Sequence, residues 1–119
     1  MPKFVFPIIE LVDRYTIALV KYEKTGGANA PELHFYEQQM QQLNMNLIQQ
    51  ELHSLTEIHR KIWAMEDKFK KGQIDNAPIN EIGLQALAIR DLNNHRIEYK
   101  NTIAEKMQDS VREIKKYGP

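Results

Sequence analysis

Apolar side chains recur every three or four residues along most of the chain, which is the spacing of an amphipathic helix. The repeat holds through four segments, and turn-forming residues separate these segments from one another. We therefore predict an all-α fold, a mainly antiparallel bundle of four helices with a long C-terminal helix. The predicted helices cover about residues 7–24, 31–44, 47–71 and 80–116, in a single domain over residues 1–119.

Glycine, proline and asparagine mark the predicted boundaries. The pair Gly26-Gly27 ends the first helix, because glycine takes the left-handed conformation of a helix end at little steric cost. Pro31 suits the first turn of the second helix, where its missing N–H has no intrahelical partner. The apolar repeat weakens over residues 44–46, so we predict a break there. One unbroken helix over residues 31–71 is the alternative, and it would be long for a small domain.

The last predicted helix carries a polar interruption in a face that is otherwise apolar. Its inward stripe begins and ends with aliphatic residues, but its middle holds Asn93, Arg96 and Lys100. Polar residues also interrupt the buried-looking faces of the first and third helices. Burying an unpaired charge costs several kcal/mol, so such groups should meet. We predict that Arg96 and Lys100 lie within reach of Asp13 or Glu66.

A candidate site therefore draws on three helices. Two interpretations of it stay open: a salt-bridge network that fixes the register of the helices, or a ligand pocket. In the pocket, Arg96 and Lys100 would hold a phosphate or carboxylate and Trp63 would stack on a ring. The candidate residues are Glu10, Asp13, Thr16, His59, Trp63, Glu66, Asp67, Asn93, Arg96 and Lys100.

Motifs for metal binding and catalysis are weak in this chain. Glu10 and Asp13 have the three-residue spacing of a magnesium-binding pair, but no second pair with that spacing faces them convincingly. The sequence contains no HExxH, P-loop, dinucleotide fingerprint or nucleophile motif. We predict no metal and no cofactor, and no residue is assigned a catalytic role. The alternative is a metal-dependent enzyme acting on a phosphorylated nucleotide or sugar, with Asp13 and Glu66 as acid, base or metal ligands.

Composition narrows the classes of partner. Lys and Arg number 16 and Asp and Glu number 16, so the formal net charge is zero. Proteins that bind nucleic-acid phosphates usually show a basic excess, so we expect no nucleic-acid partner. The absence of cysteine favours a cytoplasmic protein. The N-terminus does not look like a signal peptide, and no run approaches the ~18 apolar residues of a membrane span.

The length of the last predicted helix suggests a second copy of the chain. At 1.5 Å per residue, residues 80–116 would extend for roughly 55 Å, about twice the length of the first helix. Apolar residues at its end would then need cover that one copy does not supply, so we expect a homodimer. A frayed, charged tail is the alternative. The residues in question are Met107, Val111, Ile114 and Tyr117.

Three segments together resemble a family of small, uncharacterised helical proteins of bacteria and their phages. The segments are residues 10–17 (ELVDRYTI), 62–67 (IWAMED) and 93–103 (NNHRIEYKNTI). The family pattern is E-L-x-D-K/R-x-T-I, then L-W-x-x-E-D, then N-D-x-R-x-x-L-K-x-x-I. The resemblance covers about residues 8–107 and departs at Asn94, where the family has Asp, and at Tyr99, where it has an aliphatic residue.

Members of this family often occur beside sugar-nucleotide and glycosyltransferase enzymes. The resemblance thus implies a helical fold and the same candidate residues, but no reaction. With the polar cluster, it favours a non-enzymatic accessory or binding protein. The expected ligand is anionic and resembles a phosphate or a sugar nucleotide, although an enzymatic role stays open.

Overall fold

The structure, a computed structural model, describes residues 6–70 and 78–113, without the side chains of residues 69 and 70. The predicted all-α fold is confirmed, since this part of the chain forms helices and contains no strand. The elements are α1 (Ile8–Thr25), α2 (Ala30–Met40), a short 3-10 turn η1 (Met45–Leu47), α3 (Gln49–Lys70) and α4 (Ile79–Lys106).

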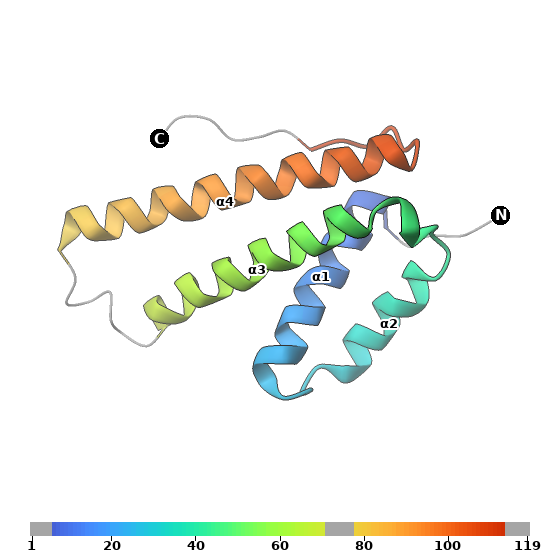
Figure 1. The fold of residues 1–119 in the computed structure, drawn as a ribbon. Helices are drawn as coiled ribbons and strands as arrows, with labels where there is room; N and C mark the ends of the chain where they lie inside the picture. The colour runs from blue at the N-terminus through green and yellow to red at the C-terminus, as the bar shows by residue number, and fades with distance from the viewer. Residues whose placement is uncertain (1–5, 71–77, 114–119) are drawn as a thin grey trace.

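The helices form two antiparallel hairpins that cross one another (Figure 1). Helices α1 and α2 make the first hairpin, and α3 and α4 make the second. Helix α1 lies between the hairpins, because it packs on α2 on one side and on α3 and α4 on the other. The end of the second hairpin where α4 begins extends past α1 and α2 (Figure 1).

The glycine pair ends α1 as predicted. Gly26 and Gly27 both have positive φ angles, 65° and 91°, which glycine adopts without a Cβ clash. The N–H of Gly27 donates to the carbonyl of Tyr22 at 3.0 Å, which closes the last turn of the helix. Asn29 Nδ2 then donates to the carbonyl of Ala18 at 3.1 Å. This bond holds the start of α2 against α1.

The predicted break between the second and third helices is present. Helix α2 ends at Met40, earlier than the predicted residue 44, because the next backbone bonds tighten to a three-residue spacing. In this turn the N–H of Leu43 donates to the carbonyl of Met40 at 3.0 Å. The chain then passes through η1 and brings Ile48 into the core before α3 begins at Gln49 rather than at residue 47. The predicted end at residue 71 lies just outside the described residues.

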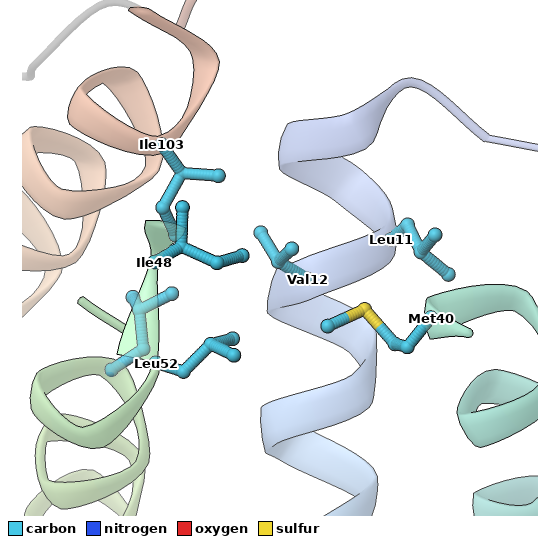
Figure 2. Packing of buried hydrophobic residues seen from close by; sticks show 7 residues of the cluster. Leu11, Val12, Met40, Ile48, Leu52 and Ile103 are labelled. Atoms are coloured by element: carbon cyan, nitrogen blue, oxygen red, sulfur yellow. The ribbon is translucent and has the colours of Figure 1, made fainter. Parts of the chain in front are cut away.

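The core draws on all four helices. Helix α2 contributes Met40, which is 1 % exposed and reaches α1 beside Leu11 (Figure 2). On the other side of α1, Val12 faces the side chains of the second hairpin (Figure 2). Helix α2 has one apolar line, and its packing on α1 buries that line. The core cluster is Leu11, Val12, Met40, Ile48, Leu52, Leu55 and Ile103.

The predicted end of the last helix is wrong. Helix α4 ends at Lys106 instead of about residue 116, and Gln108 takes a left-handed conformation with φ 56°. The N–H of Asp109 donates to the carbonyl of Ala104 at 2.8 Å, and the N–H of Gln108 donates to the carbonyl of Glu105 at 3.1 Å. These two bonds make a Schellman motif, which satisfies the last carbonyls of a helix and reverses the chain.

Contacts with distant residues explain why the helix ends there. Asp109 Oδ2 accepts the backbone N–H of Ile8 at 3.2 Å, so a carboxylate lies at the positive N-terminus of α1. The Asn101 side chain binds both the N–H and the carbonyl of Glu113, each at 2.9 Å. Residues 107–113, the return segment, therefore turn back along α4 (Figure 1). The rest of the predicted helix, residues 114–116, lies outside the described residues.

This correction changes which apolar residues at the C-terminal end need cover. Met107 packs against the core, Val111 is 41 % exposed, and Ile114 and Tyr117 lie outside the described residues. The most exposed apolar side chains lie at the start of α4 instead, where Ile79 is 87 % and Leu84 is 65 % exposed.

Candidate functional site

Asp13 is the centre of a polar cluster between α1, α3 and α4. His59 Nε2 donates to Asp13 Oδ1 at 2.8 Å, since an ionised carboxylate can only accept. Arg96 Nε lies 3.5 Å from Asp13 Oδ1, and Lys100 Nζ lies 3.5 Å from Oδ2. Both cations thus lie within reach of Asp13, as their place on the inward stripe indicated.

Each of these side chains is carried inward by apolar neighbours on its own helix. Asp13 lies one turn after Ile9, which is buried on α1. His59 lies one turn after the buried Leu55 on α3, and Lys100 lies one turn before the buried Ile103 on α4. Residues three or four apart share one face of a helix, so the burial of the apolar residues determines the direction of the polar ones.

Opposing effects act on the pKa of Asp13. Burial is the largest single cause and raises the pKa, because the charged form loses water. The hydrogen bond from His59 and the charges of Arg96 and Lys100 lower it, and together they hold the pKa below its ordinary value of 3.8. The buried carboxyl group is therefore ionised at neutral pH.

Lys100 is enclosed by carboxylates. Its ammonium group lies 2.5 Å from Glu113 Oε2, 3.3 Å from Glu10 Oε1 and 3.5 Å from Asp13 Oδ2, and its side chain is 1 % exposed. Burial of an unpaired ammonium would cost several kcal/mol, so this residue needs such partners. The sequence did not indicate Glu113 as a member of the cluster, because the predicted last helix continues through this residue to about residue 116. The weak helix formers Asp109 and Ser110 were the one signal for an earlier helix end.

Arg96 is less enclosed than Lys100. Its side chain is 24 % exposed, and one terminal nitrogen donates to Asn93 Oδ1 at 3.1 Å. Its Nε is buried and makes no hydrogen bond, because the approach to Asp13 is an ion pair without hydrogen-bond geometry. A guanidinium has five N–H donors, and hydrogen bonds within the described residues use one of them. Arg96 therefore retains donors that a bound anion could use.

A pocket of about 330 Å³ opens beside the cluster, between α1, α3 and α4. We call it the Trp63 pocket. One wall is apolar and consists of Ile17, Val20, Ile62 and Trp63. The polar side consists of His59, Glu66, Asn93 and Arg96.

Three candidate residues take other positions than a closed cluster would require. Thr16 is fully buried, and its hydroxyl faces the backbone carbonyls of its own helix at 2.9 and 3.1 Å. Glu66 lies on the exposed side of α3 and, in the part of the chain that the structure describes, pairs with neither Arg96 nor Lys100. Asp67 follows it on the helix about 100° away and is half-buried. The prediction that Arg96 and Lys100 reach Asp13 or Glu66 is confirmed through Asp13.

The carboxylates of the cluster surround a lysine. Glu10 and Asp13, the pair with magnesium-site spacing, both contact Lys100 Nζ. Within residues 6–70 and 78–113, no three His, Asp or Glu side chains lie together in a group that could hold a metal ion. Nor does any helix over these residues combine the length and apolar character needed to cross a membrane.

Comparison with known proteins adds no assignment. The chain matches no protein-family model, no curated protein and no solved structure. The family resemblance seen in the sequence therefore stays a prediction. Function has to be inferred from the geometry of the site.

Proposed function

We propose that this is a non-enzymatic binding protein that holds a small anionic ligand in the Trp63 pocket. The carrying observation is Arg96, which lies on the pocket wall, is partly exposed and has unused N–H donors. A planar guanidinium binds two oxygens of a phosphate or carboxylate at once, which favours an anionic group at this position. The cysteine-free composition supports a cytoplasmic location.

The opposite wall of the pocket suggests the remainder of the ligand. Trp63 offers an aromatic surface for a sugar or base, and the neighbouring aliphatic side chains exclude water from it. The volume of about 330 Å³ is near the lower limit for small-molecule sites. A sugar phosphate, or the sugar and phosphate part of a nucleotide sugar, fits these properties best.

Within this proposal Arg96 and Lys100 have different roles. Lys100 is 1 % exposed and surrounded by carboxylates, so a ligand could reach it only if one of them moved. We assign it to the salt-bridge network that joins α1, α4 and the return segment. Arg96 is the cation that a ligand can reach directly. The salt-bridge network and the ligand pocket, which the sequence left as alternatives, thus involve different residues of one cluster. Lys100 belongs to the network and Arg96 to the pocket.

The alternative of a metal-dependent enzyme draws less support from the site. It needs carboxylates that are free to bind a cation, whereas Glu10 and Asp13 contact the ammonium of Lys100. A magnesium-dependent rise in melting temperature that is lost in Asp13→Asn would favour this alternative.

The single tryptophan provides a direct test of the proposal. Trp63 lines the pocket, so its fluorescence should change on titration with a nucleotide sugar such as uridine diphosphate glucose, or with inorganic pyrophosphate. Hydrogen bonds to charged groups contribute about 1.5–3 kcal/mol, so Arg96→Met should weaken binding by about tenfold or more. The matched control is Arg90→Met, which removes a guanidinium of similar exposure from the same helix.

Two results would contradict the proposal: no fluorescence or melting response to any of these anions, or equal loss of affinity in both variants. Arg96→Lys serves if Arg96→Met fails to fold, because it keeps the charge and loses the planar fork. A bound ligand should also raise the melting temperature, and this rise should continue with the logarithm of the ligand concentration above the dissociation constant.

We further propose that the protein is a homodimer, and that the start of α4 forms the interface. Seven of the eleven residues from 79 to 89 are Ile, Leu or Ala, so this part of the helix is apolar on most sides. Such a helix is normally buried all round. Ile79, Leu84 and Leu87 are nevertheless 87 %, 65 % and 46 % exposed in one copy.

A further inference from the structure

His59 has a second ring nitrogen that the polar cluster does not use. Its Nε2 donates to Asp13 Oδ1 at 2.8 Å, and its side chain is 7 % exposed. Within residues 6–70 and 78–113, Nδ1 makes no hydrogen bond, and it is not one of the fully enclosed polar atoms. Because His59 lines the Trp63 pocket, this nitrogen can bind a molecule that enters the pocket.

The bond to Asp13 determines what Nδ1 can do. The ionised carboxylate of Asp13 only accepts, so it holds a ring proton on Nε2. Arg96 and Lys100 already place two positive charges beside this carboxylate, so a ring with a single N–H fits the site better than an imidazolium. In that form Nδ1 is an acceptor, and it needs a hydroxyl or N–H group as its partner.

The unused nitrogen lies near the anion-binding position proposed above. His59 Nε2 and Arg96 Nε contact the same oxygen, Asp13 Oδ1, at 2.8 and 3.5 Å, so these two nitrogens are no farther apart than the two distances together. Both side chains line the Trp63 pocket. A phosphate ester held by Arg96 would therefore bring a hydroxyl on the carbon next to the ester close to the His59 ring.

We propose that His59 determines the specificity of the pocket by binding a hydroxyl group next to the anionic group of the ligand. The ligand class is then a sugar phosphate whose phosphorylated carbon neighbours a free hydroxyl. This inference rests on the ligand site proposed above. Glu66 lines the same polar side, and an ionised carboxylate also only accepts, so the pocket offers Arg96 to the anion and acceptors to the hydroxyl groups.

Two ligands that differ by one hydroxyl test this inference. Glucose 1-phosphate and 2-deoxyglucose 1-phosphate are titrated against the full chain by isothermal calorimetry. A ligand without the hydroxyl leaves the acceptor of His59 unpaired in the pocket, so the wild type should bind glucose 1-phosphate about fivefold more tightly, or better. In His59→Phe, which keeps a planar ring but has no acceptor, the two dissociation constants should become equal.

The ratio of the two dissociation constants separates specificity from a structural role. A structural role alone would weaken both ligands equally in His59→Phe, and an unchanged ratio would overturn the proposal. His53→Phe is the matched control, since it removes an exposed histidine of α3 that lines a different cavity, and it should keep the wild-type ratio. If circular dichroism shows that His59→Phe does not fold, the wild type decides alone, because equal dissociation constants there would also overturn the proposal.

The same titrations distinguish failure of this inference from failure of the pocket itself. If the wild type binds both esters equally and Arg96→Met weakens both, the anion site stands and selection by His59 is wrong. If neither ester binds, the proposed ligand site fails, and the role of His59 fails with it.

Discussion

Asp13 shows how one buried residue can combine the demands of folding and of a polar site. Its carboxylate is desolvated, which alone would favour the neutral form, yet two cations and a histidine N–H surround it. Asp13 also links the two parts of the cluster, since Lys100 contacts it on one side and Arg96 on the other. A substitution here should therefore affect stability in a way that depends on pH.

Asp13→Asn is expected to lower the free energy of unfolding by about 2–3 kcal/mol at neutral pH, because it removes the charge that three donors face. The folded-state pKa of Asp13 is below the unfolded value near 3.8, so its ionisation stabilises the protein above that pH. This stability is lost as the pH falls through the folded-state pKa. The difference between wild type and Asp13→Asn should therefore shrink below pH 3.8.

Urea unfolding across this pH range measures the difference. Glu23→Gln is a suitable control, since Arg60 also lowers the pKa of Glu23, but this pair lies at the surface. Surface ion pairs contribute less than about 1 kcal/mol. A difference between wild type and Asp13→Asn that stays constant down to acid pH would contradict the role given to the Asp13 charge.

At the scale of elements, the end of α4 is determined by contacts that are distant in sequence. The apolar repeat continues past Lys106 through Met107 and Val111, so periodicity alone predicts a longer helix. The Schellman turn at Gln108 becomes favourable because Asp109 reaches Ile8 and Glu113 reaches Asn101 and Lys100.

Gln108→Gly distinguishes a left-handed turn at residue 108 from a continued helix, because the two predict opposite changes in the free energy of unfolding. Gln108 has φ 56°, a conformation that favours glycine, so the substitution should raise the free energy of unfolding by about 0.5–1 kcal/mol. If residue 108 lay inside a helix, glycine would lower it by a similar amount. Urea unfolding measures this change. Gln108→Val should lower the free energy of unfolding, because a β-branched residue tolerates the left-handed conformation poorly.

The difference between contacts set by one helix and contacts that are distant in sequence explains which residues of the site could be predicted. Asp13, His59, Arg96 and Lys100 interrupt apolar stripes, and a helix carries such residues to the position that the stripe occupies. Glu66 fits a stripe almost as well, but its side chain is exposed and lines the Trp63 pocket, and no pattern within one helix reports which of its residues a neighbouring helix covers. Glu113 joins the cluster through a turn and two distant bonds, so the sequence around it holds little sign of its role.

At the scale of the whole molecule, the crossing of two hairpins explains which surfaces are covered. Helix α1 packs against the half of the second hairpin where α3 begins and α4 ends, so the first turns of α4 extend beyond it (Figure 1). The expectation of a homodimer thus moves from the C-terminal residues to the start of α4. A dimer through this surface would join the two copies at the ends farthest from their α1–α2 hairpins.

Light scattering after size-exclusion chromatography tests this proposal. The wild type is expected to have the mass of two chains at micromolar concentration, and Leu84→Glu with Leu87→Glu should give one chain, because buried unpaired charges oppose association. Val111→Glu is the matched control, since Val111 is 41 % exposed on a different part of the surface. A monomeric wild type would contradict the proposal, and so would a double variant that remains dimeric.

The bond between Ile8 and Asp109 joins residues that are 101 positions apart. During synthesis on the ribosome, the first turn of α1 is complete long before its carboxylate partner exists. We expect the α1–α2 hairpin and α3 to associate first, while the face of α1 that receives α4 stays open. Helix α4 and the return segment then pack on this face in a later step, so the first turn of α1 receives its carboxylate partner about 100 residues later in synthesis.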